Sequence, residues 1–252
     1  MAIKKSQLYS SIWKSCDELR GSMDASQYKD YILVILFVKY LTDKYYGKKN
    51  QQIEVPDGAS FHDMIKLKGK SNIGEGINKI ISKLTEANHL GNLTKDANFD
   101  DSDKLGSGKA KVDKLSKIVG IFQNDSLDFS KNKAEGDDII GDAYEYLMRN
   151  FATQSGKSKG QFYTPAEVSR IIAKVVGTAN TKRKSQTVYD PTCGSGSLLL
   201  KAHDESPVPD GLTIYGQEKD LATSSMAKMN MYIHNAPLAE IKNEDTISSP
   251  QF

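Results

Sequence analysis

The segment Asp190-Pro-Thr-Cys-Gly-Ser-Gly196 has the residue types and spacing that best suit ligand binding in this sequence. A short apolar run precedes it and a helical pattern follows it, so it is predicted to join a strand to a helix. Gly194 and Gly196 permit unusual backbone angles and let a ligand approach the backbone without meeting a Cβ. The carboxylate of Asp190 suits a ligand with a positive group, such as the amine of the methionyl part of S-adenosylmethionine.

A second carboxylate strengthens this interpretation. Glu218 follows Ile214-Tyr-Gly-Gln at the end of the next predicted strand, where a carboxylate can accept both hydroxyls of a ribose. A P-loop is disfavoured because no Gly-Lys-Ser/Thr follows the glycines. A dinucleotide-binding turn is disfavoured because the third glycine is missing and an aspartate stands where the pyrophosphate would approach. An ordinary glycine turn beside a surface glutamate remains the alternative.

The elements that must position these residues alternate between strand and helix, which is typical of βαβ units with a parallel sheet. Thr164-Pro-Ala-Glu167 predicts the start of a helix that ends at Gly177, with Thr164 as the N-cap and Pro165 at the first helical position. The strand before the glycine turn is predicted at 187–189, and the next strand is predicted at 212–215. Helices are predicted from 197 and over 222–234, the last with Met226, Met229 and Ile233 inward.

The first half of the sequence shows helical periodicity. Helices are predicted over 8–19, 73–84, 112–122 and 140–151, and the polar stretch 96–111 is predicted to be a loop. The run from Tyr31 to Tyr45 is apolar nearly all round and has no turn signal. This pattern favours the central helix of a bundle.

The composition limits the class of protein. Hydrophobic residues make up 38% and charged residues 26% of the 252 residues, and the mean hydropathy is −0.51, which is typical of a globular protein. The longest apolar run, Ile32–Val38, is far shorter than the roughly twenty residues of a membrane span. No signal peptide is recognisable, so a cytoplasmic protein without membrane contact is expected. The two cysteines and four histidines are scattered, and no metal site is predicted.

The net charge of +2 is unevenly distributed along the chain. Residues 96–145 contain twelve acidic and seven basic residues, whereas residues 153–186 contain seven basic residues and one acidic residue. The second stretch could meet a polyanion such as nucleic acid, although a solvated basic face is the commoner explanation of such a run.

These motifs together resemble a known family. The glycine turn, preceded by Gln161-Phe-Tyr-Thr-Pro165 and followed by Gly216-Gln-Glu218 and Glu244-Asp-Thr246, is similar to the modification (M) subunit of type I restriction–modification systems, an adenine-N6 DNA methyltransferase. Similarity to the helical N-terminal domain of that family is carried by residues 13–21, 28–32, 39–41 and 144–148. The resemblance covers nearly the whole chain and is dense over 8–46 and 137–247.

The resemblance implies a helical N-terminal domain, residues 1–135, followed by the cofactor-binding half of a Rossmann-like S-adenosylmethionine-dependent methyltransferase domain, residues 136–252. Five residues would close over the cofactor, namely Gln161, Phe162, Tyr163, Thr164 and Pro165. The methionine end would be held by Asp190, Gly194 and Gly196. Glu218 would bind the ribose, and Asp245 would accept from the exocyclic amine of the adenine. Lys157, Lys159, Lys182, Arg183 and Lys184 are the candidates for contact with the DNA backbone.

The sequence departs from the family pattern at its C-terminal end. Amino methyltransferases carry an Asn/Asp/Ser-Pro-Pro-aromatic tetrapeptide that seats the target base, and this sequence contains no Pro-Pro pair. Ser249-Pro-Gln-Phe252 follows Ile247 too closely for a strand to present it, so it is rejected as the catalytic loop. No catalytic residue is therefore assigned, and we expect the chain to be the N-terminal portion of a longer subunit and inactive alone.

The activity implied by the resemblance is methyl transfer from S-adenosylmethionine to adenine N6 in duplex DNA, with the target read by a specificity subunit. A second modification subunit and a restriction subunit would complete the assembly. Two other functions stay open from the sequence. One is a non-catalytic assembly or DNA-binding module, and the other is an RNA or small-molecule methyltransferase with a similar cofactor loop.

Overall fold

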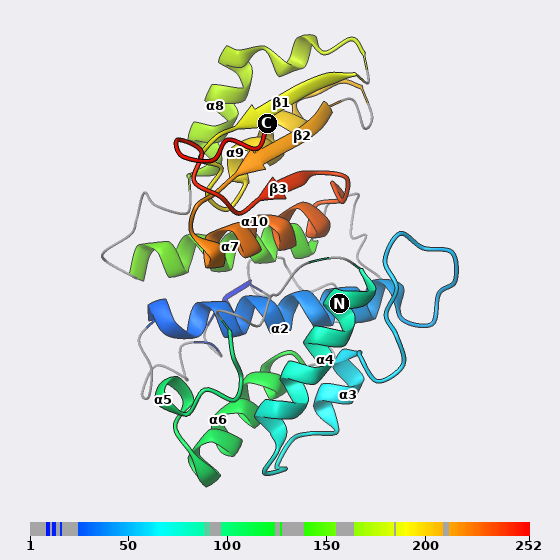
Figure 1. Ribbon diagram of the computed structural model, residues 1–252, viewed down its shortest axis with the longest axis vertical. Coiled ribbons are helices and arrows are strands. Elements are labelled where there is room, and N and C mark those ends of the chain that lie inside the picture. Colours follow the sequence, from blue (N-terminus) through cyan, green and yellow to red (C-terminus); the bar gives the residue numbers. More distant parts are fainter. Residues whose placement is uncertain are drawn as a thin grey trace. The chain divides into compact units, whose positions relative to one another are not determined.

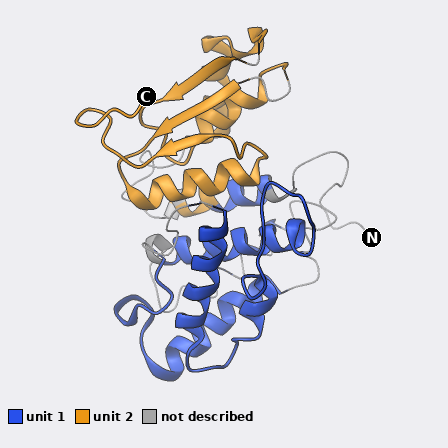
Figure 2. Cartoon of the chain, turned by 45° about the vertical axis from the view of Figure 1, so that its right-hand side comes forward, with its two compact units in different colours: residues 1–147 blue, residues 148–252 orange. Residues whose placement is uncertain are grey.

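The computed structural model describes residues 9–10, 12–13, 16, 25–88, 90, 97–123, 127, 139–154, 164–183, 185–208 and 212–252. The chain divides into two compact units, residues 1–147 and residues 148–252 (Figure 2). The division falls within helix α7 (Ile139–Gln154). The domain boundary predicted at 135/136 lies outside the described residues.

Unit 1 is helical in its described parts. Its main helices are α2 (Ala25–Tyr45), α4 (Ile73–Ala87) and α6 (Gly108–Ile121), with the short helices α3 (Phe61–Ile65) and α5 (Ser102–Leu105) between them. Every side chain from Tyr31 to Val38 is buried, which confirms the predicted central helix. No helix among the described residues is long and apolar enough to cross a membrane. Residues 9–10, 12–13 and 16 of the helix predicted over 8–19 are described and are helical, and its other residues lie outside the described residues.

In unit 1, helix α3 was not predicted from the sequence, and one predicted loop is partly helical. Helix α3 begins with a capping box in which Ser60 and Asp63 satisfy each other's backbone N–H groups. The prediction of a loop over 96–111 was wrong in part, because the Asp101 carboxylate accepts hydrogen bonds from the N–H groups of Asp103 and Lys104 and so starts α5. Polar caps and turns share the composition of a loop, and this explains the error.

Unit 2 contains a parallel sheet in the order β1-β2-β3 (Figure 1). The strands are β1 (Gln186–Asp190), β2 (Leu212–Gln217) and β3 (Glu240–Lys242). They are connected by α9 (Ser197–Asp204) and α10 (Leu221–Ile233). Asp190 pairs with Gly216 and Gln217 pairs with Lys242, so all three strands end at the same edge. The residues that follow the strands are thereby brought together, as ligand sites of open α/β sheets require.

The core of unit 2 lies between the sheet and the helices α9 and α10. Leu199 of α9, Ile214 and Ile241 of the sheet and Met231 of α10 belong to one buried cluster. The three side chains predicted to face inward from α10, those of Met226, Met229 and Ile233, are buried as expected. Because side chains alternate along a strand, Tyr189, Tyr215 and Gln217 lie on the opposite face of the sheet.

Helix α8 (Ala166–Val176) packs against α9 through small side chains. Ser169 and Ala173 are buried, whereas Ile171 and Val175 are 63% and 81% exposed. Pro165 is the N-cap residue and no side chain caps the helix, so the predicted capping by Thr164 was wrong. Gly177 ends the helix in the left-handed conformation, as predicted, and the 3₁₀ turn Thr178–Asn180 follows. A pocket of about 220 Å³ lies between α8, β1 and α9.

Candidate functional site

The turn after β1 is held by its own backbone. The N–H of Gly196 donates to the carbonyl of Cys193 at 2.8 Å, and the N–H of Cys193 donates to the carbonyl of Gln217 at 2.9 Å, which ties the turn to β2. Gly194 and Gly196 have φ angles of +55° and +80°. A Cβ built on Gly196 would lie 2.4 Å from Cε of Met231. Glycine at 196 is therefore favoured by its backbone angle, and a larger residue would also have to displace the end of the Met231 side chain.

Glu218 links the end of β2 to this turn. Its Oε2 accepts a hydrogen bond from the N–H of Gly194 at 3.1 Å, and its Oε1 accepts one from the N–H of Asp220 at 2.8 Å. An ionised carboxylate has about four acceptor sites, so two remain for a ligand. The structure thus joins two residues, Gly194 and Glu218, that the sequence predicted to act together.

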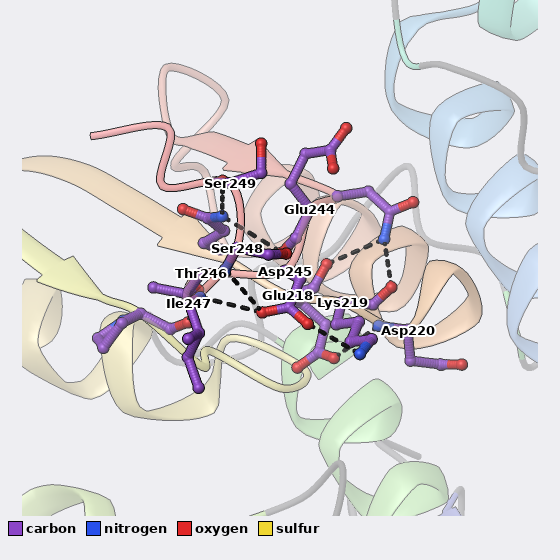
Figure 3. Close-up of polar contacts among 12 residues, drawn as sticks. Glu218, Lys219, Asp220, Glu244, Asp245, Thr246, Ile247, Ser248 and Ser249 are labelled. Atoms are coloured by element: carbon purple, nitrogen blue, oxygen red, sulfur yellow. Dashed lines mark hydrogen bonds and ion pairs between the residues drawn. The ribbon is translucent and has the colours of Figure 1, made fainter.

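Asp245 occupies the turn after β3 (Figure 3). Its Oδ2 pairs with Nζ of Lys219 at 2.8 Å, and its Oδ1 accepts from the N–H groups of Ile247 at 3.0 Å and Ser248 at 3.4 Å. These hydrogen bonds, that from Lys219 first, hold the pKa of Asp245 below its usual range. The carboxylate is therefore charged and oriented, and because a carboxylate oxygen can accept two hydrogen bonds, Oδ2 can accept from a ligand while it pairs with Lys219.

Asn243 brings the turn after β3 next to the residues that follow β2. Its Nδ2 donates to the carbonyls of Glu218 and Lys219, both at 2.9 Å. The hydroxyl of Thr246 donates to the carbonyl of Pro191 and so joins the same segment to the turn after β1. The three predicted positions Gly194, Glu218 and Asp245 are consequently parts of one hydrogen-bonded edge.

Asp190 and Cys193 differ in what they can do chemically. Burial raises the pKa of Asp190, although the N–H of Thr192, at 3.0 Å from Oδ1, acts in the opposite direction. A cationic ligand group would favour the charged form of this carboxyl. Burial, followed by the charges of Asp190 and Glu218, raises the pKa of the Cys193 thiol to about 12. Since the thiolate is the nucleophile, Cys193 serves as a small buried residue of the turn.

The edge of the sheet therefore presents carboxylates to a ligand that offers hydrogen-bond donors or a positive charge. Among the residues that the structure describes, no three histidine, cysteine or acidic side chains are grouped as metal ligands would be. The acceptors that face the edge are Asp190, Glu218 and Asp245. Amine or hydroxyl groups of a ligand could donate to carboxylates of this kind.

Comparison with known proteins indicates the family to which these carboxylates and the glycine turn belong. Residues 135–252 match the family described as N-6 DNA Methylase, and residues 8–122 match the HsdM N-terminal domain family. The two matches follow each other along the chain and leave few residues unassigned. The chain belongs to the modification-subunit family of type I restriction–modification systems.

Individual relatives support membership of the modification-subunit family. The methylase subunit of the type I restriction enzyme MpnII of Mycoplasma pneumoniae is 29% identical, over 96% of this chain and 53% of the relative. The MjaVIII methylase subunit of Methanocaldococcus jannaschii is 26% identical, over 99% and 45%. A solved type I methyltransferase subunit from Streptococcus thermophilus has a TM-score of 0.79 at 27% identity, over 98% of this chain and 60% of that chain. The chain spans about half the length of the curated relatives it matches.

Several predicted site residues of this modification-subunit chain cannot be placed. Gln161, Phe162, Tyr163, Lys157, Lys159 and Lys184 lie outside the described residues. Thr164 and Pro165 precede α8, where the carbonyl of Pro165 accepts from the N–H of Ser169 at 3.0 Å. Lys182 and Arg183 are exposed just before β1. Their backbone N–H groups donate to Oε1 of Gln186, at 2.7 and 3.2 Å.

Sequence reasoning missed the amides that hold the site together. Asn230 of α10 is buried and donates from Nδ2 to the carbonyl of Ser195 at 3.1 Å, and Asn243 and Gln217 anchor the turn after β3. Gln217 precedes Glu218 in the motif Gly216-Gln-Glu218. Its place in that motif was the signal by which it could have been found. The ring of Phe252, from the rejected tetrapeptide, lies 4.7 Å from that of Tyr215.

Proposed function

We propose that this chain is the cofactor-binding part of an adenine-N6 DNA methyltransferase subunit, which transfers the methyl group of S-adenosylmethionine to adenine N6 in duplex DNA. The observation that carries the proposal is Glu218, whose carboxylate is fixed by two backbone N–H groups beside the glycine turn and keeps acceptor sites for a ribose. The family matches support the same activity.

The residues present fit this cofactor, which supplies an activated methyl group. Asp190, Gly194 and Gly196 would hold its methionine end. A positive ligand group would stabilise the charged form of the Asp190 carboxyl, whose pKa is raised by burial, and the glycines leave the backbone accessible. Glu218 would bind both ribose hydroxyls, and Asp245 would accept from the adenine amine. Residues 161–165 would close over the bound molecule. The chain thereby restricts the orientation of the methyl donor relative to an incoming amine.

We assign no catalytic residue to this chain, since its sequence lacks the Pro-Pro tetrapeptide that would seat the target adenine. In the complete enzyme, the basic residues Lys157, Lys159, Lys182, Arg183 and Lys184 would contact DNA phosphates. A specificity subunit would read the target sequence, and a second modification subunit and a restriction subunit would complete the assembly. We place the enzyme in the cytoplasm and its two domains at residues 1–135 and 136–252.

Calorimetric titration of the 252-residue chain tests the cofactor assignment. S-Adenosylhomocysteine, which keeps the amine, the ribose hydroxyls and the adenine amine, should bind saturably at one site. ATP and NAD should not bind, because the turn carries Asp190 where their phosphates would approach and no P-loop lysine. Absence of binding by S-adenosylhomocysteine, or equal binding by NAD, would contradict the proposal.

A further inference from the structure

Gln217 is the last residue of β2 and is completely buried, although it is an uncharged polar residue beside an open sheet edge. It lies on the face of the sheet away from α9 and α10. The side chain contacts the segment from Glu244 to Gln251, which follows β3 and carries Asp245. Burial of a primary amide is costly unless its hydrogen bonds are made, so its partners indicate what it does.

All four hydrogen-bonding positions of the Gln217 amide are used. Nε2 donates to the carbonyl of Ser249 at 2.8 Å and to that of Glu244 at 3.3 Å. Oε1 accepts from the N–H of Gln251 at 3.1 Å and from the hydroxyl of Tyr189 at 3.2 Å. An amide has two donor hydrogens and two acceptor lone pairs, so this set is complete.

The orientation of this amide follows from its partners. Backbone carbonyls only accept and a backbone N–H only donates, so Nε2 must face Glu244 and Ser249 while Oε1 faces Gln251. A carboxylate at this position would place an acceptor against two carbonyls. An apolar side chain would remove the side-chain partner of the Glu244 carbonyl and of the Gln251 N–H, and would leave the Ser249 carbonyl with Nε2 of Gln251 at 3.3 Å. Residue 217 therefore needs to be an amide for the segment to lie where it does.

We infer that Gln217 is a positioning residue that fixes the segment 244–251 across the end of β1 and β2 and thereby holds the Asp245 carboxylate toward the adenine of the methyl donor. Two of its hydrogen bonds reach the segment beyond Asp245 and one reaches the residue before it. Asp245 is thus clamped from both sides. The part of this role that concerns the adenine rests on the proposed function. The part that concerns the position of segment 244–251 does not.

The first measurement examines the clamp without any ligand. In Gln217→Met, which keeps the volume of the side chain, the amide N–H groups of residues 244–249 and of Gln251 should exchange with solvent about tenfold faster or more. Glu244→Ala is the matched control, because it removes an exposed side chain from the same segment but keeps the backbone carbonyl that Gln217 binds. Exchange at the parent rate in Gln217→Met would overturn the inference.

The second measurement asks whether the clamp acts on the adenine end in particular. Affinity is measured for S-adenosylhomocysteine and for S-inosylhomocysteine, in which a carbonyl replaces the adenine amine. The parent chain should prefer the amine by about 10- to 100-fold, since one charge-assisted hydrogen bond is gained. In Gln217→Met the preference should fall to about threefold or less, whereas Glu244→Ala should keep it. Equal loss of affinity for both ligands with the preference retained would overturn the inference and leave Gln217 a merely structural residue.

Two outcomes need separate treatment, namely a Gln217→Met variant that does not fold and a parent chain that binds neither ligand. If Gln217→Met does not fold, Tyr189→Phe removes one hydrogen bond from Oε1 at a partly exposed side chain and should change both measurements in the same direction by a smaller factor. If Tyr189→Phe then changed neither the exchange rates nor the preference for the adenine amine, the result would count against the inference. If the parent chain binds neither nucleoside, the proposed function fails, and the exchange measurement still decides whether Gln217 holds the segment.

Discussion

The turns after β1 and β3 meet at one edge of the sheet but are held in different ways. The turn after β1 depends on backbone hydrogen bonds and on left-handed glycines, and Cys193 and Ser195 within it are buried. The turn after β3 depends on side chains, namely those of Asp245, Gln217 and Asn243. The first is held mainly by its backbone, to which Glu218 and Asn230 each add one side-chain hydrogen bond. The second depends more on side chains, which can be removed one at a time.

The largest effect is expected from Gly196→Ala. An alanine at φ +80° costs about 1–3 kcal/mol of unfolding free energy through backbone strain, and the buried methyl of Met231 must also move. Gly177→Ala is the control, since its φ of +82° is nearly the same and its nearest neighbour, Nδ2 of Asn180, lies 3.3 Å away. Urea unfolding should show the greater loss for Gly196→Ala, and equal losses would mean that the contact with Met231 is unimportant.

Glu218→Ala tests the carboxylate that accepts a hydrogen bond from the turn after β1 and is proposed to bind the ribose. Removal of the carboxylate deletes the brace on Gly194 and the acceptor for the ribose, so affinity for S-adenosylhomocysteine should fall by about 10- to 100-fold. Glu244→Ala removes an exposed carboxylate from the same edge and should leave the affinity unchanged. Calorimetry on the three proteins makes the comparison. Similar affinities for Glu218→Ala and the parent chain would refute the ribose assignment.

The smallest effect is expected from Lys219→Met, which acts on the turn after β3 alone. The pKa of Asp245 should rise toward its ordinary value of about 3.9 without reaching it, because the N–H groups of Ile247 and Ser248 still favour the charged form. Because the pKa of Asp245 is lowered in the folded chain, its stabilising effect is present above about pH 4 and is lost as the pH falls through the lowered value. NMR titration of the Asp245 carboxyl measures the change. Lys242→Met, which removes a charge paired with Glu240, should leave that pKa where it is.

Much of the site could be predicted because parallel strands impose a simple rule. Residues at the carboxyl ends of neighbouring strands must meet, so the strand pattern alone was enough to bring the glycine turn and Glu218 together. The hydrogen bond from Gly194 to Glu218 agrees with that reasoning. The ion pair between Lys219 and Asp245 could not be foreseen, since each residue follows a different strand and side-chain direction decides the contact.

Periodicity and turn chemistry predicted the longer helices and the strands β1 and β2 in their order, and the residues of α8 that share an apolar face, but they missed the short helices α3 and α5. They could not say whether that face is covered. In the tertiary structure Ser169 and Ala173 pack against α9 while Ile171 and Val175 are exposed. Likewise Gln217 is an ordinary polar residue in the sequence, and its burial follows from a segment 27 to 34 residues further along the chain. Local patterns record which side chains lie together on an element, whereas long-range packing decides what covers them.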